Sequence, residues 1–404
     1  MSSRLRESLL LVFPEVPYPA RENGISIRYT PIIERLHEKY EIHVALILRP
    51  GVVFSGDDHF SSMCKSVNVY QRRPVSVSMF RRVATRLVKI FPIGLPFQSY
   101  YYDNQEVDRF LRDVLSRSFD RIVWVTSVYL EIGFRYIDPQ TISVDAIDSA
   151  YSYFLREHKK SIFYSVDHRL VCRWEKFIIK KTKVVSFVSP ADVLLYKNDP
   201  VLSSKVHLIP NGVYLKDCIS DLFGKVSTSN TRMLTVGFLG NMGYQPNILA
   251  ALRLKRIFDR LKLRFPDVKL TVIGRCPVDE IKDLAKHDGV CVTGTVENIW
   301  PHVAEVDIFV FPMVSGAGQQ NKFLEVMIAK RPVVANALAN SGVGAVPGKD
   351  FLLAETDDDF VEAIIVLLSS ALKRDELGLS GQQFIRDRYD WDNIAPRLES
   401  LWRL

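Results

Sequence analysis

Short apolar segments alternate with longer helical stretches along both halves of this chain. The alternation predicts parallel β-sheets covered by helices, because parallel neighbours need a crossover connection that is usually a helix. The first half is expected to contribute strands at residues 8–13, 41–48, 121–126, 141–145, 183–189 and 205–210. The second half is expected to contribute strands at residues 233–240, 268–274, 290–294, 307–312, 332–336 and 350–354. We therefore expect an α/β protein built from two doubly wound units.

The length of the chain agrees with two domains. A chain of 404 residues with 47% hydrophobic residues is too long for one typical domain and can bury a core in each half. Residues 214–232 lose all periodicity and gain Ser, Thr, Asn and Gly, so they are predicted to be a linker. The first domain is then 1–213 and the second 233–388, and a last helix at 389–404 could cross back to the first. Because open α/β sheets bind ligands outside the carboxyl ends of their strands, the chemistry is expected in loops that follow strands.

A glycine loop and the helix after it give the strongest binding signal in the second half. Gly316 and Gly318 let the backbone approach a ligand closely, and the next helix offers unpaired N–H groups to an anion. Lys322 lies in the first turn, where the helix dipole opposes a cation by roughly 0.3–1 kcal/mol unless a bound phosphate offsets it. Glu325 could accept hydrogen bonds from the vicinal hydroxyls of a sugar. The alternative is a surface ion pair between Lys322 and Glu325, with Asn321 as the helix cap.

Three other predicted strands of the second half also end in glycine. The first of them leads into a turn with Gly240 and Asn241, followed by Pro246 at the start of a long helix. Its Gly-x-x-Gly-x-x-Gly spacing differs from the dinucleotide fingerprint Gly-x-Gly-x-x-Gly, which disfavours a nicotinamide cofactor. Four glycine-bearing strand ends in one half favour a pocket for a nucleotide diphosphate.

Several segments, in this order and at these separations, carry a family resemblance: "HLIPNGV" (207–213), "GFLGNMGYQPN" (237–247), "TVIG" (271–274), "VTGTV" (292–296), "DIFVFP" (307–312) and "NKFLEVMIAKRPVVAN" (321–336). The first half adds "PYPARENGISIR" (17–28), "VDAIDSAYS" (144–152) and "CRWEKFII" (172–179). Together they resemble the family 4 glycosyltransferases, which have the two-domain GT-B fold with a central cleft. The resemblance spans nearly the whole chain and is more specific in the second half.

The resemblance implies a nucleotide-sugar donor held by the second domain. Lys322 would bind the diphosphate, and Glu325 would bind the ribose hydroxyls. Thr295 and Val296 would hold the base through backbone contacts. No cofactor is implied, because the nucleotide sugar is a substrate.

The resemblance also points to the first domain and to two departures from the family pattern. Gly24 would face the diphosphate from across the cleft, and Asp148 would lie near the transferring sugar or the acceptor. Retaining members commonly carry a glutamate where this chain has Ala317, which loosens the inference of retained configuration. Many members place an arginine where this chain has Asn241, and Arg275 is the nearest substitute.

A metal ion is not expected in this mechanism. A fixed lysine and a helix N-terminus can stabilise the negative charge that develops on the leaving diphosphate. The acidic runs at 357–359 and 390–392 are interpreted as helix starts, and no histidine pair has ligand spacing. A retaining enzyme needs no protein base, because the donor phosphate takes the acceptor proton. An inverting enzyme would need Asp148 or Asp145 as base, while Asp148 could instead be a helix N-cap.

Charge and cysteine content bear on location and on competing functions. The first 213 residues carry 30 Lys and Arg against 22 Asp and Glu, and the basic amphipathic stretch 71–91 could lie on an anionic membrane surface or pack its apolar stripe on the core. Five scattered cysteines and no apolar run of about 18 residues favour the cytoplasm. The basic first domain suggests peripheral attachment to the inner face of the membrane. We expect a role in surface polysaccharide or glycolipid assembly. A sugar-nucleotide epimerase and a non-catalytic nucleotide-sugar-binding protein remain alternatives, whereas nucleic-acid binding is suggested by charge alone.

Overall fold

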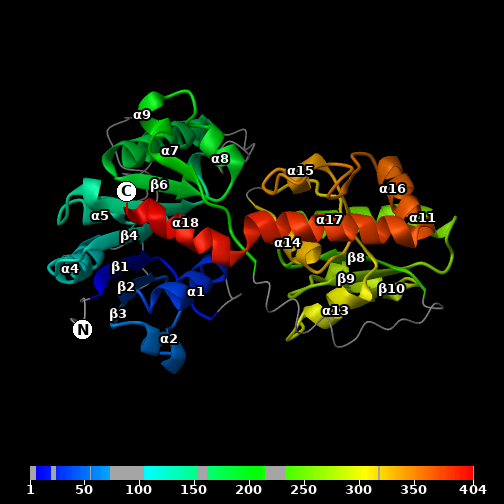
Figure 1. The fold of residues 1–404 in the computed structure, drawn as a ribbon, viewed down its shortest axis with the longest axis horizontal. Coiled ribbons are helices and arrows are strands. Elements are labelled where there is room, and N and C mark those ends of the chain that lie inside the picture. The colour runs from blue at the N-terminus through cyan, green and yellow to red at the C-terminus, as the bar shows by residue number, and fades with distance from the viewer. Residues whose placement is uncertain are drawn as a thin grey trace. The chain divides into compact units, whose positions relative to one another are not determined.

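Two units of α/β structure make up this protein in the computed structural model, which describes residues 6–19, 24–54, 56–72, 104–152, 162–213, 233–316 and 319–403 (Figure 1). Unit 1 consists of Met1–Asn211 and Ile394–Leu404, and unit 2 consists of Gly212–Asn393. The predicted linker 214–232 and Gly318 lie outside the described residues, as does nearly all of the basic stretch 71–91.

Unit 1 is built on a parallel sheet of seven strands in the order β3-β2-β1-β4-β5-β6-β7. The strands are β1 (Glu7–Phe13), β2 (Tyr40–Leu48), β3 (Ser66–Gln71), β4 (Arg121–Val125), β5 (Ile142–Ile147), β6 (Val184–Phe187) and β7 (Val206–Leu208). Its helices in the described residues are α1 (Gly24–Leu36), α2 (Asp58–Met63), α4 (Asn104–Leu115), α5 (Leu130–Gly133), α7 (Ile162–Lys181), α8 (Pro190–Leu194) and α9 (Pro200–Ser203). The prediction omitted β3, which is an edge strand of mixed polar and apolar residues.

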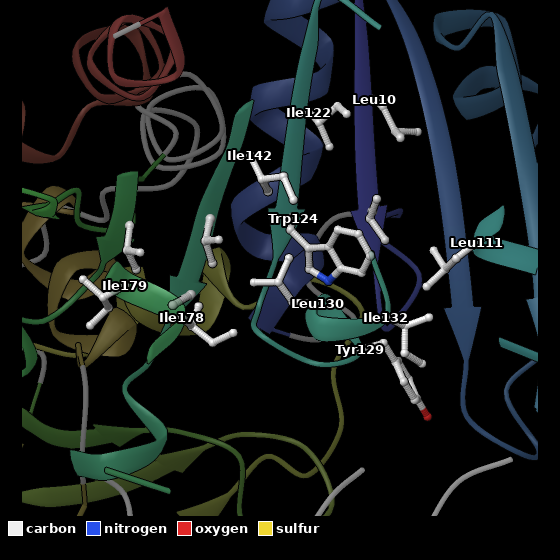
Figure 2. Close-up of a cluster of buried hydrophobic side chains, with 14 of the residues drawn as sticks. Leu10, Leu111, Ile122, Trp124, Tyr129, Leu130, Ile132, Ile142, Ile178 and Ile179 are labelled. Carbon is white, nitrogen blue, oxygen red and sulfur yellow. The ribbon is translucent and has the colours of Figure 1, made fainter. Parts of the chain in front are cut away.

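The core of unit 1 surrounds the indole of Trp124 on β4, which is 1% exposed (Figure 2). Its indole nitrogen donates a hydrogen bond to the carbonyl of Val128 at 2.9 Å, so the buried polar atom is satisfied. Gly133 lies directly on the ring, and a Cβ there would come within 2.7 Å of it. The buried cluster that contains the indole draws on the sheet and on helices α4, α5 and α7, and includes Leu10, Leu111, Ile142 and Ile178.

The last helix, α18 (Trp391–Arg403), belongs to unit 1 from Ile394 onward. Glu399 accepts hydrogen bonds from Lys39 at 3.0 Å and from the hydroxyl of Tyr40 at 2.9 Å. Arg403 donates to the same tyrosine oxygen at 2.8 Å. These contacts hold the C-terminal residues against the start of β2.

Unit 2 contains six parallel strands in the order β10-β9-β8-β11-β12-β13. They are β8 (Thr235–Leu239), β9 (Lys269–Ile273), β10 (Val290–Val292), β11 (Ile308–Phe311), β12 (Val333–Ala335) and β13 (Leu352–Leu353). The helices in its described residues are α11 (Gln245–Lys262), α12 (Asp279–Lys282), α13 (Trp300–Glu305), α14 (Asn321–Ile328), α15 (Ala337–Asn340), α16 (Asp357–Ser369) and α17 (Ala371–Tyr389). Every strand predicted for this half is present.

Both sheets have the doubly wound strand order, in which the first strand of a unit lies between its second and its fourth. The order therefore reverses between β1 and β4 in unit 1 and between β8 and β11 in unit 2. Ligands of such sheets bind outside the carboxyl ends of the strands at this switch point. Within the described residues, no helix is both long enough and apolar enough to cross a membrane.

Candidate functional site

The candidate donor site lies at the carboxyl ends of β8 and β11 in unit 2. Helix α14 follows β11 and packs against α17, which explains why five of its eight residues are buried apolar side chains. Lys322 is the second residue of α14 and only 8% of it is exposed. The helix cap is Gln320, and Asn321 is the first helical residue. The alternative of a surface ion pair capped by Asn321 is therefore wrong.

The amine of Lys322 lies among apolar and weakly polar groups. Its Nζ is 5.1 Å from the ring centroid of Phe238 on β8 and 5.9 Å from that of Phe311 on β11. It donates a hydrogen bond to Oδ1 of Asn247 at 2.5 Å. Burial lowers the pKa of Lys322 to about 7, although the carboxylate of Glu325 opposes the shift. An anion placed beside this amine would restore its positive charge.

Asn247 connects Lys322 to the loop after β8. Its Nδ2 donates to the carbonyl of Asn241 at 3.0 Å, while its Oδ1 accepts from Lys322. A Cβ at Gly240 would lie 2.9 Å from that Nδ2, so only glycine leaves room for the amide. Asn247 was not among the residues predicted from the sequence. The feature that could have indicated it is its position directly after Pro246 in the first turn of α11.

The loops after β8, β9 and β11 meet at this edge of the sheet. Gly274 has φ +155°, and a Cβ there would come 1.7 Å from the carbonyl oxygen of Gly240. The carbonyl of Arg275 accepts a hydrogen bond from the N–H of Met242 at 2.8 Å. Gly316 has φ +137°, and a Cβ there would lie 3.9 Å from the ring of Pro246. The predicted residues of these loops therefore form one cluster around the start of α11.

The predicted base-binding residues lie farther along the same edge. Thr295 is exposed and its hydroxyl accepts a hydrogen bond from the N–H of Cys276 at 3.3 Å, which ties the loop after β10 to the loop after β9. Val296 follows and is half-buried. Their proposed contacts with a base are backbone contacts, so an exposed loop at this place suits the role.

Gly24 and Asp148 both belong to unit 1. Gly24 is exposed and is the first residue of α1. Asp148 is exposed and follows Ile147, whose φ of +65° is strained for a β-branched residue. The helix after it is capped by Ser149, whose hydroxyl accepts from the N–H of Ser152 at 3.0 Å. The interpretation of Asp148 as an N-cap is therefore wrong.

A buried carboxylate holds the loop that carries Asp148. Glu175 on α7 accepts hydrogen bonds from the backbone N–H groups of Ala150 at 3.0 Å and Tyr151 at 3.1 Å. The N–H of Ala150 donates to Oε1, whereas Oε2 accepts from the N–H of Tyr151 and also from the hydroxyls of Ser149 at 2.8 Å and Tyr196 at 2.5 Å. Burial raises the pKa of Glu175, and these donors oppose the rise. A buried carboxylate that accepts hydrogen bonds from four donors fixes the position of this loop, which directly follows the strained residue Ile147.

Asp145, the other base considered for an inverting reaction, has a structural role. It is fully buried and forms an ion pair with Arg28, with Nε 2.6 Å from Oδ2. The hydroxyls of Tyr29 and Ser186 donate to it at 2.7 and 2.8 Å. A carboxylate with these partners and no exposure does not reach a substrate, so this assignment is wrong.

The acidic runs begin helices, as predicted. Thr356 caps α16 in a capping box with Asp359, and Asp357 pairs with Arg253 at 2.7 Å. Asp390 accepts from the N–H of Asp392 at 3.0 Å before α18. Among the described residues, no group of three or more His, Cys, Asp or Glu side chains is placed to hold a metal ion.

Comparison with known proteins identifies the region that carries the site. Residues 234–370 match the family model for glycosyl transferases group 1. A protein of Klebsiella pneumoniae, described as an uncharacterized 44.6 kDa protein in the cps region, is 22% identical over 407 residues, covering 95% of this chain and 96% of its own.

Solved structures extend the likeness to the whole chain. The sucrose-phosphate synthase of Thermosynechococcus elongatus superposes with a TM-score of 0.65 at 15% identity, covering 98% of each chain. Anabaena HepE in complex with UDP-glucose gives 0.63 at 15% identity, covering 98% of this chain and all of its own. WaaG, a glycosyltransferase involved in lipopolysaccharide biosynthesis, gives 0.63 at 13% identity, covering 96% and 98%. The family match of residues 234–370 in unit 2 and the GT-B fold of both units make this protein similar to the group 1 glycosyltransferases.

Proposed function

We propose that this protein is a glycosyltransferase that moves a sugar from a nucleotide-diphosphate donor, held by unit 2, to a hydroxyl of a glycan or lipid-linked acceptor. The observation that carries the proposal is the buried amine of Lys322 at the β8/β11 switch point. A buried lysine at the start of a helix is costly, and a diphosphate bound there would offset both the dipole repulsion and the loss of hydration.

The catalytic role of unit 2 is to stabilise the negative charge of the leaving group. When the bond between the sugar and the diphosphate breaks, negative charge develops on the leaving phosphate. Lys322 and the N–H groups of α14 stabilise that charge without a metal ion. Glu325 binds the ribose hydroxyls, and the backbone at Thr295 and Val296 holds the base.

The acceptor side rests on unit 1. An acceptor hydroxyl attacks the sugar from the face that the nucleotide leaves, the new glycosidic bond retains the configuration, and the donor phosphate takes the proton. Asp148 lies near the transferring sugar or the acceptor, and Gly24 near the diphosphate. The resemblance to the family 4 glycosyltransferases supports this mechanism.

UDP-glucose is the first donor to test, because the HepE structures contain UDP and UDP-glucose. A role in polysaccharide assembly is supported by the relative in a cps region. The enzyme would act in the cytoplasm at the inner face of the membrane. Sedimentation with vesicles of acidic lipid at low salt tests the attachment, and a protein that stays in the supernatant contradicts it.

Donor binding is tested by calorimetry with UDP and UDP-sugars on the full chain. Lys322→Met should abolish binding, while Lys255→Met should not, because the Lys255 amine pairs with Asp259 at 2.7 Å elsewhere on α11. Wild-type affinity in Lys322→Met would overturn the proposal. Turnover in EDTA with a retained anomeric configuration supports the mechanism. Donor isomerised without an acceptor would indicate an epimerase, and donor bound without turnover a binding protein.

A further inference from the structure

Unit 1 has a candidate ligand site of its own, a cavity of about 440 Å³. Its wall comes from side chains that follow β1 and from side chains that follow β2: Pro14, Glu15, Val16, Tyr18, Pro19, Arg49, Val52, Val53, Phe54 and Asp57. β1 is one of the two strands at the switch point of this sheet. Ligand sites of open α/β sheets lie outside the carboxyl ends of the strands, and their volumes are roughly 300–1,000 Å³. Both position and size therefore fit a small ligand.

The wall combines apolar side chains with charged ones, and one side is aromatic. The ring of Tyr18 stacks on that of Phe60, with centroids 5.6 Å apart and 26° between the planes, so its orientation is fixed. The other apolar side chains of the wall are Pro14, Val16, Pro19, Val52, Val53 and Phe54. Val53 is 72% exposed. A rigid ring beside aliphatic groups suits the C–H face of a sugar, which is apolar while its hydroxyls point outward.

Three charged groups complete the wall. Glu15 and Arg49 form an ion pair at 2.5 Å, with the guanidinium side chain 59% exposed and the carboxylate side chain 27% exposed. Paired charges of this kind can both accept from and donate to vicinal hydroxyls. Burial, together with the carboxylates of Asp57 and Glu34, raises the pKa of Tyr18, so its phenol stays protonated and can donate.

The same charges disfavour a phosphate in this cavity. Arg49 is neutralised by Glu15, and the carboxylate of Asp57 leaves the wall with a net negative charge. Asp57 also accepts a hydrogen bond from the N–H of Phe60 at 3.0 Å, so a carboxylate already occupies the N-terminus of α2. An anion would meet repulsion here, in contrast to the region around Lys322.

We propose that this cavity binds a neutral sugar unit of the acceptor and discriminates against a phosphorylated one. The proposal rests on the proposed function, because it assigns the acceptor side of the same transfer. It names a substrate class, a neutral pyranose, and the residues that select it: Tyr18, Glu15 and Arg49.

Saturation-transfer NMR on the full chain tests the proposal with methyl α-D-glucopyranoside, methyl β-D-galactopyranoside and glucose 6-phosphate as probes. UDP is present at saturation, so that a signal from the donor site is blocked. At least one neutral glycoside should give a signal several-fold stronger than the phosphate. Tyr18→Ala and Glu15→Gln should each reduce that signal at least fivefold.

Asp108→Asn is the matched control, because Asp108 pairs with Arg135 at 2.8 Å with side-chain exposures of 23% and 62%, close to those of Glu15 and Arg49. It should leave the signal unchanged. Signals that persist in Tyr18→Ala and Glu15→Gln, or a stronger signal from glucose 6-phosphate, overturn the proposal. Calorimetry with UDP on the same samples separates the two claims. UDP binding without any glycoside signal refutes this cavity alone, and a glycoside signal without UDP binding refutes the proposed function.

Discussion

Replacing Lys322 with methionine should stabilise unit 2 while it abolishes donor binding. The pKa of Lys322 falls from 10.5 to about 7 on folding. One pKa unit corresponds to about 1.36 kcal/mol of free energy. At pH 7 the amine is fully protonated in the unfolded chain and about half protonated in the folded one, so the shift lowers the free energy of unfolding by roughly 4 kcal/mol at this pH. Methionine has a similar shape and no charge, so it removes this cost.

Part of that gain is offset by Asn247. Its Oδ1 loses the hydrogen bond from Lys322, and a buried acceptor left without a partner costs about 1–3 kcal/mol. The net stabilisation at pH 7 is therefore about 2 kcal/mol. For a domain of this size, each kcal/mol raises the melting temperature by about 2–4 °C, so the expected rise is about 4–8 °C.

The pH dependence of this effect has a definite sign. A lysine whose pKa is lowered on folding binds fewer protons in the folded than in the unfolded state between pH 7 and 10.5, so wild-type stability rises with pH across that window. The advantage of Lys322→Met should thus be largest below pH 7 and should shrink as the pH rises toward 10.5.

Differential scanning calorimetry of the full chain between pH 6 and 9 measures the effect, followed by titration with UDP. Lys255→Met is the control, because that amine is paired with Asp259 and its removal should not stabilise the protein. A variant of Lys322 that melts at or below the wild-type temperature and still binds UDP would refute the reasoning about this amine.

Three further predictions concern the site and its support. UDP affinity should be constant just below pH 7 and weaken by up to about tenfold per pH unit above it, because binding raises the pKa of Lys322 and takes up a proton. Calorimetry in two buffers of different ionisation enthalpy measures the number of protons taken up. No proton uptake at pH 8 would contradict the prediction. Gly240→Ala should weaken UDP binding at least tenfold, because its Cβ would displace Asn247, whereas Gly243→Ala meets no atom closer than 3.4 Å and should bind normally; equal affinities would exclude a role for this packing. Glu175→Gln should lower the transfer rate with UDP affinity unchanged, because the amide cannot accept from all four donors; an equal loss in both would point to general unfolding instead.

The sequence predicted the strands well where burial is uniform. The segment LLLVF of β1 is buried throughout, and such apolar runs are typical of parallel strands covered on both faces. β3 was missed because it lies at the sheet edge, where Ser66, Asn68 and Gln71 interrupt the apolar pattern. The pattern therefore failed at β3, whereas the edge strands β7, β10 and β13 were identified.

The local site residues were predictable and the non-local ones were not. Glycines at strand ends and Lys322 in a first helical turn are visible in short segments. Asn247 and the wall of the unit 1 cavity are not, because their importance comes from loops that the sheet order brings together. The two alternatives that placed helix caps at Asp148 and Asn321 were each wrong by one residue, because Ser149 and Gln320 occupy the N-cap positions.

Lys322 shows why a conflict between local rules can indicate function. Burial and the dipole both disfavour a lysine in the first turn of an apolar helix, yet the fold buries it beside two phenylalanine rings. Stability alone would select methionine or leucine at this position. A residue that lowers the free energy of unfolding by several kcal/mol is retained more readily when it contributes to ligand binding. For a buried amine that ligand is an anion, because its negative charge stabilises the protonated form. Ile147 presents a similar conflict, because its backbone has a strained φ of +65°. It directly precedes Asp148 and the loop that Glu175 holds, so this is the first place in unit 1 to test for an effect on catalysis.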